Sequence, residues 1–310
     1  MMTAAALPGH AAEVTIDGGR APLHGDLTLP AAEGPVPAVL MIAGSGPTDR
    51  DGNTLPVSTP NTLRLLAEAL GEQGIASLRF DKRGVGASAA AAGEQAETGF
   101  DVFVEDAVAW ARFLEEQQGV GCVFLLGHSE GALIAALAAA EVDTCGVISI
   151  AGAGRPIGDV LRDQLTGLNA AGALPEPLFG QAMAILARLE RGERVAEVPP
   201  ELASLFHPVL QTFLLSWMEK DPAAAVAAID APVLVLQGTT DLQVGTADAE
   251  LLAAANPRAR LELLEGVNHV LKLAPPDQAA NLATYADPNL SLAPGVAEMI
   301  AGFVQENAAE

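Results

Sequence analysis

Short apolar runs alternate with amphipathic segments along most of the 310-residue chain. Continuous apolar runs of this length, bounded by turn residues, are typical of strands that are buried on both faces of a sheet. The predicted strands lie at residues 37–43, 75–80, 122–126, 146–150, 232–236 and 260–264. Helical patterns separate them, at residues 61–70, 99–116, 247–255 and 294–304. The alternation predicts an α/β fold with a mostly parallel sheet that helices cover on both faces, and Asn61 is the expected N-cap of the first helix.

Two segments depart from this alternation. Residues 13–29 alternate apolar and polar positions around Asp17-Gly18-Gly19, which predicts an antiparallel hairpin at the start of the sheet. Residues 155–230 are helical in pattern, with several prolines as breaks. We therefore expect residues 1–154 and 231–310 to form the core domain, and residues 155–230 to form a helical cap inserted between two strands.

The apolar run at 122–126 leads into Gly127-His128-Ser129-Glu130-Gly131 and then directly into a helical stretch of Ala and Leu. This order is that of a nucleophile elbow, a tight strand-to-helix turn that holds one serine at the tip of a parallel sheet. The two glycines lie where the strand and helix backbones approach so closely that a Cβ atom would collide. A lone G-x-S-x-G motif is common by chance, so the flanking strand and helix carry the interpretation.

A serine hydroxyl becomes a good nucleophile only when a base takes its proton and an acid orients that base. In the elbow arrangement the chain order is serine, acid, histidine. Two histidines follow Ser129. His269 lies in a loop at the carboxyl end of the run at 260–264, which suits a base. His207 is the weaker alternative and is expected to pack within the cap.

Asp241 is the favoured acid, because it follows the run at 232–236 and precedes His269 by one strand-helix-strand unit. A turn or helix-cap role is the structural alternative for a loop aspartate. Asp221 and Asp230 are weaker candidates for the acid.

The tetrahedral intermediate of acyl transfer needs N–H donors for its oxyanion. One would be the backbone N–H of Glu130, next to the nucleophile, and the other should come from the loop after the run at 37–43. Gly44-Ser45-Gly46 suits this loop, because glycine permits the dihedral angles that aim successive N–H groups into one cavity. We expect the Ser45 N–H to be this donor, with the Gly46 N–H as second choice.

Four motifs follow one another along the chain. They are Gly-Ser-Gly-Pro-Thr-Asp-Arg-Asp-Gly-Asn at 44–53, Phe-Asp-Lys-Arg-Gly-Val-Gly-Ala-Ser at 80–88, Gly-His-Ser-Glu-Gly at 127–131, and the acid loop at 238–244. Together they resemble the α/β-hydrolase superfamily, and within it the bacterial capped serine esterases, over about residues 35–305. The resemblance implies an esterase that acts on acyl esters through Ser129, Asp241 and His269, without a cofactor.

Several charged residues lie at strand ends beside the elbow. We expect most of them to form ion pairs that fix the surrounding loops, because buried paired charges more often order a site than react. The specific hypothesis is that Glu130 pairs with Arg83 or Arg50.

Neither a nucleotide nor a metal is expected. Residues 84–89 match a dinucleotide fingerprint superficially, but no acidic residue closes a second strand about 20 positions on. The loop that starts at Asp49 resembles a calcium loop, but its twelfth position is Pro60 rather than Glu. No His, Cys or carboxylate cluster has metal-ligand spacing.

The formal net charge of −23 argues against nucleic acid or an anionic membrane surface as a partner. No apolar run approaches the ~20 residues of a membrane span, and no secretory signal is evident. We interpret Cys122 and Cys145 as buried free thiols in a reducing compartment, so a cytoplasmic location is expected. The oligomeric state is left open, with a homodimer as one alternative.

The expected substrate is a small uncharged ester with a short to medium acyl chain, bound under apolar cap side chains. We expect about a third of the following cap side chains to face the substrate and the rest to form the cap core: Leu161, Leu178, Phe179, Met183, Leu186, Phe206, Leu210, Phe213 and Trp217. Two alternatives stay open: a thioesterase or peptidase with the same triad, and a non-catalytic binding protein of the same fold.

Overall fold

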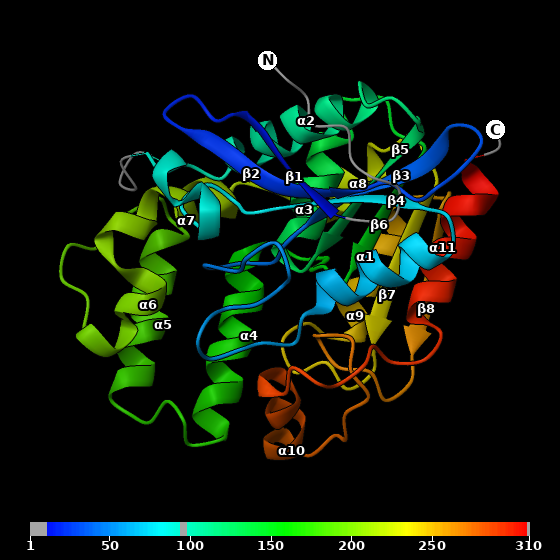
Figure 1. Ribbon diagram of the computed structural model, residues 1–310. Helices are drawn as coiled ribbons and strands as arrows, with labels where there is room; N and C mark the ends of the chain where they lie inside the picture. The colour runs from blue at the N-terminus through cyan, green and yellow to red at the C-terminus, as the bar shows by residue number, and fades with distance from the viewer. Residues whose placement is uncertain (1–10, 94–97, 309–310) are drawn as a thin grey trace.

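The computed structural model describes residues 11–93 and 98–308, and an eight-stranded sheet runs through this part of the chain (Figure 1). The strands are β1 (Ala11–Asp17), β2 (Pro22–Thr28), β3 (Val36–Ile42), β4 (Ala76–Phe80), β5 (Val120–His128), β6 (Gly146–Ile150), β7 (Val233–Gly238) and β8 (Ala259–Leu264). Their order is β1-β2-β4-β3-β5-β6-β7-β8. β2 is antiparallel to both β1 and β4, and the other neighbours are parallel. The predicted mostly parallel sheet and N-terminal hairpin are confirmed.

Alternation along the central strand β3 explains why helices cover both faces of the sheet. Leu40 and Ile42 belong to the apolar core on one face, and Val39 and Met41 belong to the core on the other. The first face is covered by α2 (Asp101–Glu115), α3 (Glu130–Ala138) and α9 (Thr246–Ala255), the second by α1 (Thr62–Glu72) and α11 (Val296–Asn307). Within the described ranges, no helix combines the length and the apolar character needed to cross a membrane.

Between β6 and β7 the chain forms a helical segment with an apolar core of its own, seen on the left of Figure 1. Its α-helices are α4 (Ile157–Ala170), α5 (Leu178–Leu189), α6 (Ala203–Phe206), α7 (Gln211–Met218) and α8 (Pro222–Ala227). Leu161, Leu186 and Phe206 are buried in this core. Helix α8 instead packs on α3 and α9, where Val226 joins the core of the sheet. These helices occupy the range that the sequence pattern predicts to be helical.

The start of α1 differs from expectation. Asn61 occupies the N-cap position, but its side chain does not cap the helix. Its Oδ1 accepts a hydrogen bond from Asn53 Nδ2 at 3.1 Å, so the side chain fixes the preceding loop instead. The structure also contains a short helix that the sequence pattern did not predict, α10 (Gln278–Ala283), whose N-cap is Asp277.

Cys122 and Cys145 form a disulfide, with their Cα atoms 6.1 Å apart. β5 and β6 are parallel neighbours, paired through Phe124 and Gly146, and this pairing brings together the cysteines that precede those two residues. Both cysteines are only partly buried. The interpretation as buried free thiols is therefore wrong, and the cysteines no longer support a reducing compartment.

Candidate active site

Ser129 lies at the sharp turn between β5 and α3. Its φ of 56° and ψ of −119° are unusual for a residue with a side chain, and its N–H donates to the Ile150 carbonyl oxygen at 2.8 Å. A residue persists in such a strained conformation only where its surroundings fix it, and strained residues cluster at functional sites. The strand, the turn and the helix therefore have the geometry of a nucleophile elbow.

The two glycines of the elbow allow this turn. A Cβ atom on Gly127 would overlap the Gly131 carbonyl, and a Cβ atom on Gly131 would overlap the Ile42 carbonyl and lie 2.8 Å from the Ala43 oxygen. The close approach predicted from the sequence is confirmed. It presses α3 against the carboxyl end of β3, so the loop that follows β3 lies next to Ser129.

His269 and Asp241 come together from the loops that follow β8 and β7. His269 Nδ1 lies 2.8 Å from Asp241 Oδ2, and the two side chains are 4% and 1% exposed. The backbone N–H groups of Gln243 and Val244 donate to Asp241 Oδ1 at 2.7 and 3.1 Å. Since Asp241 accepts at Nδ1, the neutral imidazole carries its proton there and presents Nε2 as the acceptor.

The pKa of Asp241 reflects opposing effects. Burial raises the pKa of this carboxyl, but the charge and hydrogen bond of His269, together with the two backbone donors, outweigh burial and lower it below its ordinary value. Asp241 is therefore a carboxylate at neutral pH, and its negative charge lies beside the His269 ring.

His128, for which the sequence pattern predicted no role, contacts His269. The ring centroids lie 4.8 Å apart, and His128 Nε2 donates to the His269 carbonyl oxygen at 2.7 Å. Burial, together with the nearby His269, lowers the pKa of His128 to about 4, so His128 is neutral above that pH. Its place directly before Ser129 was the only signal in the sequence. Among the described residues, no hydrogen bond joins the Ser129 hydroxyl to His269.

The loop after β3 approaches Ser129 closely. A Cβ atom on Gly44 would lie 3.3 Å from both Ser129 Cβ and His128 Nδ1. Ser45 and Gly46 line the same cavity as Ser129 and Glu130. The structure thus brings the loop predicted to supply an oxyanion donor to the nucleophile.

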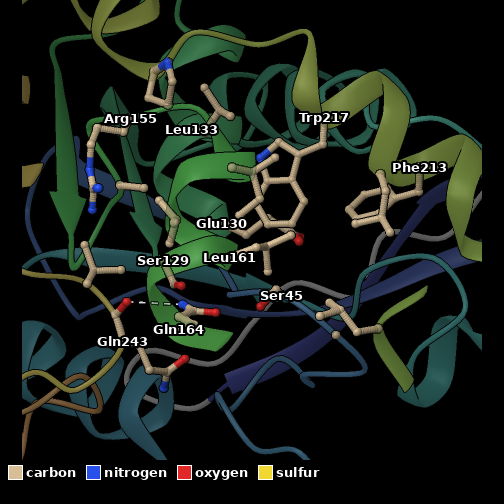
Figure 2. A pocket seen from close by; sticks show the side chains of 18 of the residues that line it. Ser45, Ser129, Glu130, Leu133, Arg155, Leu161, Gln164, Phe213, Trp217 and Gln243 are labelled. Atoms are coloured by element: carbon tan, nitrogen blue, oxygen red, sulfur yellow. Dashed lines mark hydrogen bonds between the residues drawn. The ribbon is translucent and has the colours of Figure 1, made fainter. Parts of the chain in front are cut away.

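A cavity of about 320 Å³ opens beside Ser129. Figure 2 shows side chains that line it. Its walls are mostly apolar and include Leu133 of α3, Leu161 of α4, and Phe213 and Trp217 of α7. Of the nine cap side chains proposed from the sequence, four line this cavity: Leu161, Leu210, Phe213 and Trp217. Leu186 and Phe206 instead lie in the core of the helical segment.

One edge of the cavity is polar. Arg155, Gln164 and Gln243 lie there, and Gln164 Nε2 donates to the Gln243 carbonyl oxygen at 3.1 Å (Figure 2). Arg155 is engaged by Asp248, at 2.8 Å, and by Asp163, at 2.7 Å. This guanidinium is therefore already neutralised.

The hypothesis that Glu130 pairs with an arginine is wrong. Glu130 Oε1 lies 2.8 Å from Lys82 Nζ. Arg83 pairs with Asp106, and Arg50 pairs with Asp26 and Asp81. Lys82 and Arg83 are consecutive, so their side chains leave the chain in different directions, and only Lys82 points to the elbow.

The rejected candidates lie elsewhere. His207 is exposed at the start of a 3₁₀ turn, where its Nδ1 accepts from the Val209 N–H, so the expectation that it packs within the helical segment is wrong. Asp221 caps α8 by accepting from the Ala224 N–H, and Asp230 is exposed.

Comparisons with known proteins agree with this geometry. The family described as serine aminopeptidase, S33, matches residues 60–188. Esterase EstD of Thermotoga maritima is 30% identical over 262 residues, which cover 84% of this chain. The chain spans 59% of the length of EstD.

Solved structures show the same architecture at low identity. Est1E of Butyrivibrio proteoclasticus, determined with ferulic acid bound, has a TM-score of 0.61 at 18% identity, over 96% of this chain and 100% of that one. The esterase domain of a Rhodothermus marinus protein has a TM-score of 0.59 at 19% identity, over 96% of this chain and 99% of that one. With the sheet order and the elbow, these likenesses identify the α/β-hydrolase fold in this chain.

Proposed function

We propose that this chain is a serine hydrolase of the carboxylesterase type. The observation that carries the proposal is the buried hydrogen bond between His269 and Asp241, at the sheet edge where Ser129 occupies a strained elbow. The three residues follow the chain order serine, acid, histidine. The esterase names of EstD and Est1E support an ester as the substrate.

In the proposed reaction, Ser129 Oγ attacks the ester carbonyl carbon while His269 Nε2 takes the hydroxyl proton. Asp241 stabilises the imidazolium that forms. The tetrahedral intermediate collapses, His269 returns the proton to the leaving alcohol, and an acyl group remains on Ser129. Water then attacks the acyl group by the same route and releases the acid.

The backbone N–H groups of Glu130 and Ser45 form the oxyanion hole in this proposal, with the Gly46 N–H as an alternative to that of Ser45. Glu130 begins α3, so its N–H is among those that have no partner within the helix. Gly46 has a φ of 74°, a left-handed conformation that turns the loop after Ser45.

We assign residues 155–230 as a cap on a core of residues 1–154 and 231–310. The separate apolar core of α4–α7 and the four cap side chains in the cavity support this division. A mostly apolar cavity suits an uncharged acyl chain, and each methylene that fits contributes ~0.8 kcal/mol, or about fourfold in kcat/KM. The cavity supports short to medium chains as substrates.

The test is hydrolysis of p-nitrophenyl esters from acetate to palmitate by the wild type and Ser129→Ala. We expect kcat/KM to rise to an optimum at short or medium length, and Ser129→Ala to lose activity. Leu161→Trp, which narrows the cavity, should move the optimum to shorter chains. Equal activity on palmitate, or on a matched ester with a carboxylate in its acyl chain, contradicts the proposed substrate class.

Thioester hydrolysis and peptide hydrolysis are the alternative reactions, and both would use the same proposed triad. A peptidase stays an alternative because the matching family is described as serine aminopeptidase, S33. Matched oxygen ester, thioester and anilide substrates with one acyl group separate the three. We expect the highest kcat/KM on the oxygen ester, and a higher value on the anilide would replace the esterase assignment with a peptidase.

A further inference from the structure

We propose that Lys82 is a positioning residue for the oxyanion hole, which it fixes by holding the peptide between Gly44 and Ser45. The inference rests on the proposed function, because it concerns a donor of that site. Lys82 touches no substrate in this account and acts through the backbone that it binds.

The contacts of Lys82 carry the inference. Its side chain is 4% exposed, and its Nζ donates to the Gly44 carbonyl oxygen at 2.5 Å. The same ammonium donates to Glu130 Oε1 at 2.8 Å and lies 5.7 Å from the centroid of the Phe103 ring. One buried cation thus joins the loop after β3 to the first residue of α3.

The contact between Lys82 and the Gly44 carbonyl also orients the Ser45 N–H, because of peptide geometry. The Gly44 carbonyl and the Ser45 N–H belong to one planar trans peptide, so they point in opposite directions. Holding the carbonyl oxygen on Lys82 therefore fixes the direction of the Ser45 N–H. The next peptide is held as well, because the Thr48 hydroxyl donates to the Ser45 carbonyl oxygen at 2.8 Å.

Glu130 connects the second proposed oxyanion donor to Lys82. Its backbone N–H is the other oxyanion donor, and its carboxylate holds the ammonium that orients the first. Ser45, Glu130 and Ser129 line the same cavity (Figure 2). The Lys82–Glu130 ion pair therefore sets the spacing of the two donors.

A purely stabilising role explains the pair less well. Removing two charges from water is costly, and a buried ion pair often stabilises less than apolar residues of the same volume. Among residues 11–93 and 98–308, Glu130 Oε2 is buried without a hydrogen-bond partner, so the pair is incompletely compensated. A positioning role accounts for a buried pair whose desolvation is incompletely compensated.

The test compares Lys82→Met, Glu130→Gln and the double variant Lys82→Met/Glu130→Gln. Lys82→Met leaves a buried carboxylate unpaired and should lower Tm, and the double variant should recover part of that loss. If Lys82 positions the donor, kcat on p-nitrophenyl butyrate falls about 10- to 100-fold in both variants that lack Lys82, somewhat less than the full loss of a donor. KM stays within about threefold of the wild type, because the oxyanion forms only in the transition state.

The fall in kcat should be smaller in Glu130→Gln than in the two variants that lack Lys82, because Lys82 can still bind the Gly44 carbonyl in Glu130→Gln. A trifluoromethyl ketone, which forms an oxyanion on the serine, should bind the two Lys82 variants more weakly by a factor similar to the fall in kcat. Lys220→Met is the matched control, because Lys220 also pairs with a carboxylate, Asp101, but lies outside the cavity. Its kcat should match that of the wild type.

Recovery of kcat in the double variant alongside Tm would overturn the inference, since a purely structural role predicts that the two move together. Unchanged trifluoromethyl ketone affinity in both Lys82 variants would also overturn it. A wild type that neither hydrolyses esters nor reacts with a fluorophosphonate instead overturns the proposed function, and the Lys82 inference falls with it.

Discussion

His269 Nδ1 and Asp241 Oδ2 lie 2.8 Å apart, and both side chains are almost completely buried. The contact determines which nitrogen of His269 carries the proton and which is left as the acceptor. A buried carboxylate in this place can also stabilise an imidazolium that forms for a moment during a reaction. The contact therefore supports Asp241 as the acid of the proposed triad rather than as a turn residue.

Asp241→Asn should lower kcat on a short-chain ester by about 10⁴-fold, because the amide cannot stabilise the imidazolium and favours the wrong tautomer of His269. KM should change little. Asp221→Asn is the control, since Asp221 was the alternative acid and caps α8 in the structure. A comparable loss of kcat in Asp221→Asn, or wild-type kcat in Asp241→Asn, contradicts the assignment of the acid.

His128 should make stability depend on pH. Its folded pKa of about 4 lies below the ordinary histidine value near 6.5, so the unfolded chain binds more protons between those two pH values. The free energy of unfolding should therefore fall as the pH is lowered from 7 to 4, by at most about 3 kcal/mol from this residue. Urea unfolding of the wild type and His128→Asn at pH 7 and 4.5 measures it. The difference between the two proteins should shrink at the lower pH, and a constant difference contradicts the account.

Gly131→Ala should destabilise the protein strongly, by ~3 kcal/mol or more, because the new methyl group would overlap the Ile42 carbonyl. Gly167→Ala provides the comparison. Gly167 lies within α4, and a Cβ atom there meets no described residue within 4 Å, so alanine should stabilise by ~0.5–1 kcal/mol. Urea unfolding of both variants tests the close approach of α3 and β3, and similar stabilities would contradict it.

The Cys122–Cys145 disulfide closes a loop with a sequence separation of 23 and should contribute ~3 kcal/mol to the free energy of unfolding. Urea unfolding of the oxidised wild type and Cys122→Ser/Cys145→Ser measures this contribution. The cysteines lie before the starts of the paired stretches of β5 and β6, at the end opposite the elbow, so kcat should stay within about twofold. Equal stability of the two proteins would contradict a formed disulfide.

Much of the site could be predicted because local patterns determine it. The strand before Gly127, the helix after Gly131 and the close packing between them follow from short-range sequence alone. Chain order and strand-end position then favoured Asp241 and His269, and the structure brings those two side chains together. Their catalytic roles remain predictions.

The features that the sequence did not predict depend on which segments become neighbours. The disulfide requires β5 and β6 to be adjacent, and this follows from the sheet order rather than from the spacing of the cysteines. Lys82 and Arg83 are adjacent cations, and the direction of the backbone after β4 decides which one reaches Glu130. The hydrogen bond from His128 to the His269 carbonyl likewise forms only because the loop after β8 folds over His128.

The most direct test of the central claim is labelling with a fluorophosphonate, read by intact mass, on the wild type, Ser129→Ala and His269→Ala. The account predicts one adduct on the wild type, none on Ser129→Ala, and much slower labelling of His269→Ala, because the serine then lacks its base. No adduct on the wild type, or an adduct that persists on Ser129→Ala, would contradict the claim that Ser129 is an activated nucleophile.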